Sequence, residues 1–175
     1  MRSLPITLKT VDVSLVLRMA ERATRPASRR NYLLLSRSAD GWLYLLSPLL
    51  VALVNTAAAM QFLYTCGAAF ALERSLYWTI KNTTKRARPP QSIPGLRSII
   101  IANDRFSLPS GHTSGAFLFV TVLSQCLNPL WALGYFWAAG VGTSRVGLGV
   151  HYPTDVCAGA LLGTSVGFAV SGFLL

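Results

Sequence analysis

Long uncharged stretches separated by short polar ones dominate the hydrophobic pattern of the chain. No charged residue occurs from Gly41 to Leu72 or from Phe106 to Ser144, and the last apolar segment is 153–175. A helix of about 20 apolar residues crosses the ~30 Å hydrocarbon core of a bilayer, because it rises about 1.5 Å per residue. The pattern therefore predicts an all-α fold, a polytopic membrane helical bundle.

Breaks within these stretches divide them into about five transmembrane helices. The first stretch stays apolar as far as Ile80, about twice the length of one span, and predicts a hairpin that turns near Asn55–Gln61. Asn128–Pro129 interrupts the second stretch. We place the spans at 41–58, 62–80, 110–127, 130–145 and 153–175. The glycines of the last span, Gly159, Gly163 and Gly167, recur at four-residue spacing, which favours close helix packing inside the bundle over a dimer interface.

Residues 1–40 follow a different pattern. Apolar residues recur at helical spacing from Leu8 to Met19, while charged residues fall largely between them, which predicts an N-terminal amphipathic helix on the membrane surface. The arginines of residues 22–37 surround Pro26, and we expect a basic connector that touches lipid headgroups. We interpret 1–175 as a single membrane-embedded domain, with an interfacial segment at 1–40 and the helical bundle at 41–175.

Composition supports this class and narrows the partners. Hydrophobic residues make up 52% of the chain and charged residues 13%, which is typical of a membrane protein. The net charge of +10 comes from two basic blocks beside uncharged stretches. This distribution favours membrane lipids and anionic substrates over nucleic acid. The three cysteines match no zinc or redox motif, and we expect them to be small core residues.

Candidate chemistry is concentrated in Ser144–Asp155, between the fourth and fifth predicted spans. His151 and Asp155 stand four residues apart, so the carboxylate can reach one imidazole nitrogen and leave the other as a nucleophile or base. Arg145 adds a guanidinium that can bind an anion. On this stretch alone, an ordinary loop with a satisfied histidine is an equally good reading.

The five-span topology brings further polar residues to the same membrane face. They lie in the 81–108 connection and at the start of the third span: Lys81, Arg88, Ser110, Gly111 and His112. With Arg145, Lys81 and Arg88 make three cations. Together with free backbone N–H groups at a helix start, they indicate a phosphate site. A nucleophilic histidine and a second histidine as acid would complete a hydrolase with a phosphohistidine intermediate. The chain has only six Asp and Glu, so we expect no metal cofactor.

Glu73 is an acid within the second predicted span. It lies on the same helix face as Tyr77 and Lys81, at i, i+4 and i+8, and could hold Lys81 in place. Pairing of Glu73 with an arginine inside the membrane is an equally open reading.

Three motifs resemble the signature of the type 2 phosphatidic acid phosphatase family. They are Lys81 through Arg88-Pro89, Pro109-Ser110-Gly111-His112, and Ser144-Arg145 followed by His151 and Asp155. The resemblance covers roughly 81–155, and the flanking spans match only in being hydrophobic. It implies a helical-bundle core shared with vanadium haloperoxidases, hydrolysis of lipid phosphate monoesters or diphosphates, and no metal cofactor.

By motif position, the resemblance makes His151 the nucleophile, Asp155 its orienting partner and His112 the general acid. The implied phosphate binders are Lys81, Arg88, Ser110, Gly111 and Arg145. Prenyl diphosphate, phosphatidylglycerol phosphate and phosphatidate are open as substrates, and Ile99–Ile101 could touch the lipid tail. The alternative is a non-catalytic lipid-binding or scaffold protein on the same fold. A haloperoxidase is disfavoured because the resemblance implies that those enzymes are soluble.

The basic residues also predict an orientation. They concentrate on the face that carries the candidate site, and the positive-inside rule places such a face in the cytoplasm. Many bacterial relatives are understood to face outward. A sixth span within 1–40 would remove this conflict, but it would place Asp12 and Arg18 in or beside lipid. We predict an integral protein of a bacterial inner (plasma) membrane with a cytoplasm-facing site.

Overall fold

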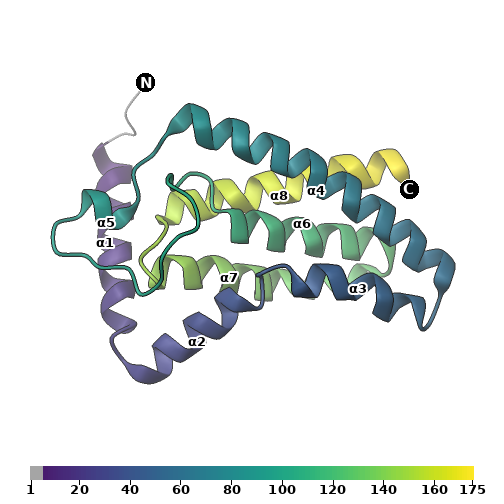
Figure 1. The fold of residues 1–175 in the computed structure, drawn as a ribbon, viewed down its shortest axis with the longest axis horizontal. Helices are drawn as coiled ribbons and strands as arrows, with labels where there is room; N and C mark the ends of the chain where they lie inside the picture. The colour runs from purple at the N-terminus through teal and green to yellow at the C-terminus, as the bar shows by residue number, and fades with distance from the viewer. Residues whose placement is uncertain (1–5) are drawn as a thin grey trace.

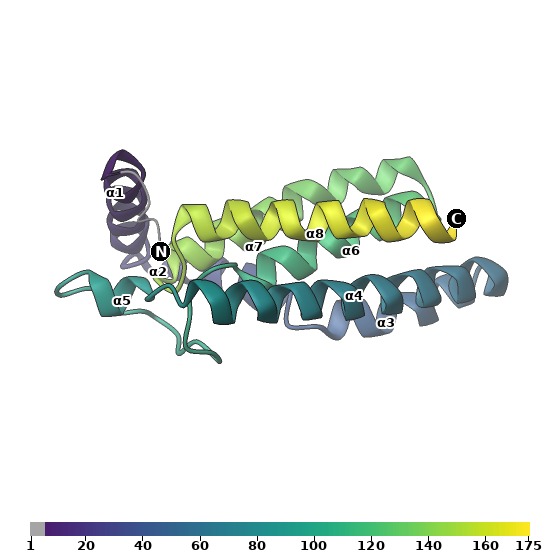
Figure 2. The ribbon, with the colours of Figure 1, turned by 90° about the horizontal axis from the view of Figure 1, so that it is seen from above.

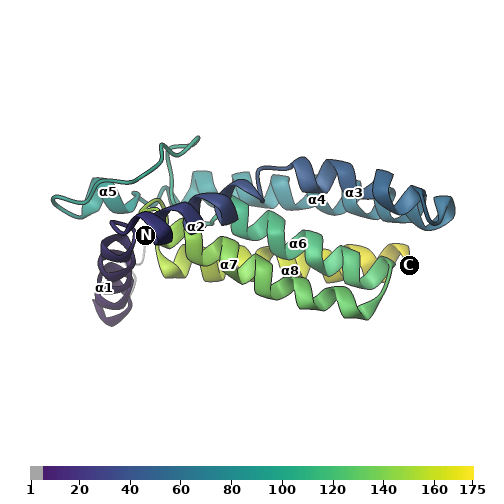
Figure 3. The ribbon, with the colours of Figure 1, turned by 90° about the horizontal axis from the view of Figure 1, so that it is seen from below.

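A computed structural model of the protein describes residues 6–175, and these contain helices and loops without a strand. The elements are α1 Ile6–Arg22, α2 Pro26–Arg37, α3 Trp42–Ala52, α4 Thr56–Thr84, α5 Pro89–Ser92, α6 Gly111–Cys126, the 3₁₀ helix η1 Pro129–Leu133, α7 Gly134–Gly147 and α8 Pro153–Leu174. The helices α3, α4, α6, α7 and α8 run side by side, and α1 lies across one end of this bundle (Figures 1 and 3). The predicted all-α class is confirmed.

Each predicted span corresponds to a helix, but the bounds differ. The hairpin turns at 53–55, earlier than predicted, because the Asn55 side chain caps α4 by accepting a hydrogen bond from the Ala58 backbone N–H at 3.0 Å. The fourth span starts with η1, which Asn128 caps by accepting from the Leu130 N–H at 2.9 Å. Among the described residues, α8 alone is both long and apolar enough to cross a membrane. The count of five spans therefore stays a prediction.

The central helix of the bundle is α6, which packs against α4, α7 and α8. The glycines of α8 permit the closest of these approaches. A Cβ added at Gly163 would lie 2.1 Å from the carbonyl oxygen of Ser114, and one at Gly159 would lie 2.6 Å from that of Ser110. Real side chains do not fit at such distances, so the backbones of α6 and α8 are in direct contact. The predicted role of the glycines in packing inside the bundle is confirmed.

Large apolar side chains cover much of the outside of the bundle. Leu45 and Leu49 of α3, Phe136 of α7 and Leu161 of α8 are each between 65% and 82% exposed. Surfaces of this kind are rare on soluble monomers and fit contact with lipid tails. Of the cysteines, Cys66 is buried as predicted, whereas Cys157 lies on the exposed side of α8.

The N-terminal segment differs from the prediction. Residues 26–37, expected as a connector, form α2, which starts at Pro26 because the fixed φ of proline suits a first helical turn. This helix packs on α7. In α1, the carboxylate of Asp12 is buried, 1% exposed, although the amphipathic pattern assigns charged residues to the outer face. Both helices are thus structural parts of the end of the bundle where α5 also lies (Figure 2).

Candidate active site

A pocket of about 640 Å³ lies between α2, α4 and the N-terminal end of α6. Five of the eight predicted site residues line it: Arg88, Gly111, His112, Arg145 and His151. Its remaining lining includes apolar groups from α2, α3, α4 and the loop before α6, namely Leu33, Tyr44, Phe70, Trp78, Ile100 and Ile101. The pocket therefore combines a cationic region with apolar walls, and these surfaces are complementary to an amphiphilic anion.

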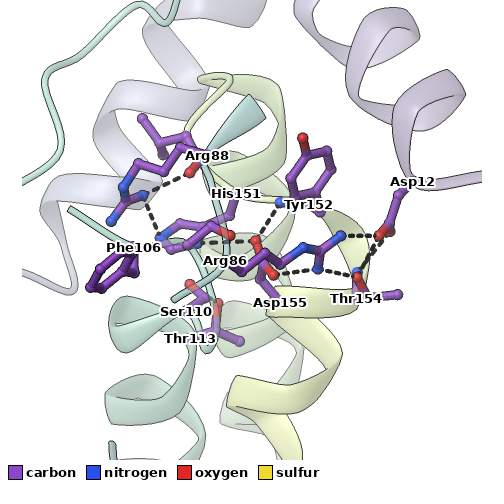
Figure 4. A network of polar contacts seen from close by, with 12 residues as sticks. Asp12, Arg86, Arg88, Phe106, Ser110, Thr113, His151, Tyr152, Thr154 and Asp155 are labelled. Atoms are coloured by element: carbon purple, nitrogen blue, oxygen red, sulfur yellow. Dashed lines mark hydrogen bonds and ion pairs between the residues drawn. The ribbon is translucent and has the colours of Figure 1, made fainter. Parts of the chain in front are cut away.

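His151 lies in the turn between α7 and α8 and is 2% exposed. Its Nδ1 is 3.6 Å from Oδ2 of Asp155, and its Nε2 is 3.4 Å from Nη1 of Arg88 (Figure 4). Local sequence explains the pairing. Pro153 starts α8, and Asp155 in the first turn accepts a hydrogen bond from the Tyr152 backbone N–H at 2.8 Å, which caps the helix and turns the carboxylate toward the preceding residues.

The imidazole of His151 is held in its neutral form. Burial lowers its pKa to about 4, and the charges of Arg88 and Arg145 act in the same direction, while Asp155 opposes them. Only a neutral imidazole has a lone pair on Nε2. The position beside Arg88 therefore leaves a nucleophilic nitrogen next to a cation that can bind an anion.

Two arginines of the site are restrained by side chains outside the three motifs. Arg88 donates through Nη1 to the Val150 carbonyl oxygen at 2.7 Å and through Nη2 to the carboxylate of Asp104. Arg145 donates through Nη1 to Oγ of Ser36 in α2 at 2.6 Å, and its Nε has no hydrogen-bond partner. Each guanidinium is fixed in place, and Arg145 retains one unpaired donor, a buried Nε.

Asp104 is a site residue that sequence reasoning missed. Its carboxylate accepts hydrogen bonds from Nζ of Lys81 at 3.0 Å and from the Tyr77 hydroxyl at 2.7 Å, in addition to the contact with Arg88. Burial opposes its ionisation, but these hydrogen bonds and the charges of Lys81 and Arg88 outweigh burial and lower the pKa of Asp104 to about 2. Its only signal in the sequence was an acid in an otherwise basic connection.

Lys81 lies behind the pocket and does not line it. Its ammonium group is 1% exposed and donates to Asp104 and to the Phe106 carbonyl oxygen at 2.9 Å. Glu73 does not reach Lys81. It forms an ion pair with Arg74 at 2.5 Å and accepts a hydrogen bond from Oγ of Ser114 at 2.5 Å. Of the two readings of Glu73, pairing with an arginine is correct.

The start of α6 supplies the remaining predicted residues. His112 lines the pocket, with Nε2 2.9 Å from Oδ1 of Asp40 in the corner between α2 and α3. Gly111 lets α4 approach, because a Cβ there would meet the Tyr77 ring at 3.0 Å. The prediction that the backbone N–H of Ser110 is free is wrong, because this N–H donates to the Asp155 carbonyl oxygen at 3.0 Å. The buried Ser110 hydroxyl accepts from Thr113 at 2.9 Å.

Within residues 6–175, no three His, Cys, Asp or Glu side chains are grouped so as to hold a metal ion. The polar groups around His151 belong to a network of cations and carboxylates drawn from α1, the start of α8 and the segments that follow α4 and α7 (Figure 4). Such a network is suited to binding a phosphate, whose oxygens accept several hydrogen bonds at once.

The helical bundle and the three motifs around its pocket define the class to which the chain belongs, and comparison with known proteins gives its family. The chain belongs to the PAP2 superfamily, whose family model matches residues 40–174. The expected family is therefore confirmed. Residues 6–39, which contribute Asp12 and Ser36 to the network, lie outside the matched region.

Particular relatives are named as phosphatases. An undecaprenyl-diphosphatase of Sulfolobus acidocaldarius is 45% identical over 67 residues, which are 36% of this chain and 31% of that protein. The chain thus spans about a third of the length of this relative. The crystal structure of Aquifex aeolicus LpxE superposes with a TM-score of 0.76 at 24% identity, covering 91% of this chain and 93% of that one. The crystal structure of a transmembrane PAP2 type phosphatidylglycerolphosphate phosphatase from Bacillus subtilis superposes with a TM-score of 0.53 at 27% identity. The match covers 93% of this chain and 95% of that one.

Proposed function

We propose that the protein is an integral membrane lipid phosphatase that hydrolyses a phosphomonoester or diphosphate of a lipid. The observation that carries the proposal is the environment of His151. Asp155 flanks its Nδ1, Arg88 lies beside its Nε2, and the residue lines a pocket with four arginines and apolar walls. Neither a lipid carrier nor a scaffold requires a buried neutral histidine between a carboxylate and a guanidinium, and this disfavours the non-catalytic alternative.

In the proposed mechanism, Nε2 of His151 attacks the phosphorus atom in line with the bond to the lipid oxygen. The new N–P bond forms as the P–O bond breaks, and His112 donates a proton to the departing oxygen. Asp155 stabilises the positive charge that develops on the imidazole. Water then attacks the phosphohistidine and gives a proton to His112, which is now neutral. The N–P bond breaks, inorganic phosphate leaves, and both histidines return to their starting protonation states.

Binding of the phosphate is assigned to the cations and to the start of α6. Arg88 and Arg145 line the pocket and contact the phosphate oxygens directly, together with the Gly111 backbone. The structure favours an indirect role for Lys81, which holds Asp104 and thereby Arg88. The Ser110 hydroxyl, also buried, is proposed as a further donor once a phosphate is bound.

The proposed substrate is a lipid whose tail stays against the apolar walls. The names of the relatives include a prenyl diphosphatase and a phosphatidylglycerolphosphate phosphatase. Prenyl diphosphate, phosphatidylglycerol phosphate and phosphatidate are therefore the substrates to test.

For the membrane arrangement, we assign five spans to a single domain: α3, α4, α6, η1 with α7, and α8. We propose that the membrane is a bacterial plasma membrane, that α1 lies at its interface, and that the site faces the cytoplasm.

A phosphate-release assay on these three lipids in detergent tests the proposal. The wild-type protein should release phosphate from at least one of them, and His151→Ala should remove turnover almost completely because the covalent intermediate is assigned to this imidazole. Vanadate should inhibit as a pentacoordinate mimic of the transition state. Appreciable turnover by His151→Ala would refute the assigned nucleophile, and absence of turnover on all phosphorylated lipids would refute the phosphatase assignment.

A further inference from the structure

Arg86 bridges two buried carboxylates beside the candidate active site. Its Nη1 donates to Oδ1 of Asp155 at 2.6 Å, and its Nη2 donates to Oδ2 of Asp12 at 2.7 Å (Figure 4). The guanidinium carbon also lies 4.2 Å from the centre of the Tyr152 ring, a cation–π contact that further restrains the side chain. Arg86 does not line the pocket. Its contacts are therefore with the catalytic machinery and not with the space for substrate.

The contacts of Asp155 divide between its two oxygens. Oδ2 accepts from the Tyr152 N–H at 2.8 Å and lies 3.6 Å from Nδ1 of His151, whereas Oδ1 is bound by Arg86. A carboxylate with one oxygen held by a guanidinium cannot rotate freely about its last side-chain bond. The contact with Arg86 thus keeps the other oxygen directed at the imidazole.

Asp12 fixes Arg86 from the opposite side. This aspartate belongs to α1 and also accepts hydrogen bonds from the backbone N–H of Thr154 at 3.1 Å and from its hydroxyl at 2.5 Å. Thr154 directly precedes Asp155 in the first turn of α8. A buried carboxylate is unfavourable without such partners. The N-terminal helix therefore holds both the guanidinium and the helix turn that present Asp155.

We propose that Arg86 and Asp12 are positioning residues that aim the carboxylate of Asp155 at His151, which makes α1 a functional part of the active site. The inference rests on the proposed function, because it assumes that His151 is the nucleophile. It extends that function to a helix outside the matched family region, residues 40–174. The competing explanation is an ion pair that only attaches α1 to the bundle.

Steady-state kinetics separate the two explanations. Arg86→Gln should lower kcat by about 10- to 100-fold and leave KM, and inhibition by inorganic phosphate, within about twofold, because the imidazole loses its orientation while the phosphate binders stay. Arg86→Lys keeps a charge at the same place and should recover most of the rate. Asp155→Asn sets the scale, since it removes the orienting carboxylate itself and should lower kcat further.

A double variant separates an effect on kcat from an effect on folding. Arg86→Gln alone leaves two buried carboxylates without a cation, whereas Asp12→Asn with Arg86→Gln preserves the local net charge and lets two amides pair. The double variant should keep the thermal unfolding temperature closer to that of the wild type and still show the reduced kcat. Lys85→Gln and Glu21→Gln remove one exposed charge each from the same loop and the same helix, and they should leave kcat unchanged.

Wild-type kcat in folded Arg86→Gln or in the double variant would overturn the inference, as would a loss of rate that only follows the folded fraction. A raised KM with unchanged kcat would also overturn it, because Arg86 would then be a phosphate contact. His151→Ala distinguishes this failure from failure of the proposed function. If His151→Ala retains turnover, the assignment of the nucleophile is wrong. If His151→Ala is inactive while Arg86→Gln leaves kcat unchanged, only the positioning role is wrong.

Discussion

Groups outside the motifs hold the side chains of the PAP2 motifs before any substrate binds. Asp104 holds Lys81 and Arg88, Ser36 holds Arg145, and Asp40 holds His112. Charged side chains fixed in this way need little reorganisation when charge develops on a phosphate, and this is the main source of electrostatic catalysis. The site is therefore preorganised by residues that its motifs do not contain.

The proposed role of His112 predicts a dependence on the leaving group. An alkoxide leaving from a phosphate monoester needs a proton, whereas a phosphate leaving from a diphosphate is a much weaker base. His112→Ala should therefore reduce kcat on a lipid monophosphate by about 10²- to 10⁴-fold and reduce it less on a prenyl diphosphate. Parallel assays of both substrates measure this ratio, and equal losses on the two would contradict the role of general acid.

The pKa of His151 gives a prediction that does not depend on turnover. Because burial lowers this pKa to about 4, the imidazole should remain neutral from neutral pH down to about pH 5 and become protonated only below that. The chain has two histidines, so His112→Gln leaves a single imidazole to observe. Titration of that imidazole by NMR in detergent micelles measures the value directly, and a midpoint near 6.5 would show that the histidine is solvated.

At the level of helices, the sequence predicted the packing of α8 better than it predicted the N-terminal segment. Gly159 and Gly163 carry their own signal, because a small side chain at regular spacing has one main use in an apolar helix. No comparable signal marked α2, since Arg25, Arg29 and Arg30 are equally compatible with a solvated loop. That segment becomes helical because it packs on α7, which is a tertiary effect.

The same distinction applies to the candidate site. Motif spacing identified His151, Asp155 and Arg88, and the structure brings them together. Spacing could not identify Asp12 or Asp104, because their partners lie 74 and 23 residues away along the chain. Nor could it show that the N–H of Ser110 is occupied, because its acceptor is a backbone carbonyl in another helix. Contacts of this kind depend on how the helices are placed relative to one another.

The contact between α6 and α8 predicts a large effect from one methyl group. At Gly163 an added Cβ would lie 2.1 Å from the Ser114 carbonyl oxygen, so Gly163→Ala must separate the two backbones and should lower the free energy of unfolding by about 1–3 kcal/mol. Thermal unfolding in detergent measures the change.

Gly172→Ala is the matched control for this substitution. It lies in the same helix with no atom within 4 Å of an added Cβ, and alanine there should stabilise the helix slightly, by at most about 1 kcal/mol. Equal unfolding temperatures for Gly163→Ala and the wild type would show that the helices are not in backbone contact.

Charge divides the molecule into two ends. The end with α1, α2 and α5 carries the N-terminal arginines together with Lys85, Arg86 and Arg97, whereas the turn at 53–55, the turn at 127–128 and the C-terminal end of α8 have no charged side chain (Figure 1). The positive-inside rule assigns the basic end to the cytoplasm. The short connections at the opposite end would then face outward.

Cysteine labelling tests this orientation. With the three native cysteines replaced, a thiol introduced by Ser92→Cys at the exposed end of α5 should resist a membrane-impermeant reagent in intact cells and react after lysis. A second variant, Val54→Cys in the opposite turn, should show the reverse, because Val54 is 91% exposed. Ready labelling of Ser92→Cys in intact cells would place the active site on the outer face.

The pocket beside His151 has walls of Tyr44, Phe70, Trp78 and Ile101, and Ile101 is 93% exposed at its edge. If the proposed function is correct, a phosphorylated lipid can present its headgroup to the pocket while its tail stays in the hydrocarbon phase, and protein and substrate then meet by diffusion in two dimensions. At a constant total amount of substrate, added detergent should slow turnover in proportion to the falling surface mole fraction of the lipid. Rates that follow the bulk molarity would instead mean that single lipid molecules reach the pocket through water. On the proposed function, membrane composition would set the effective concentration of substrate, and dilution of the substrate by other lipids in the bilayer would itself slow the reaction.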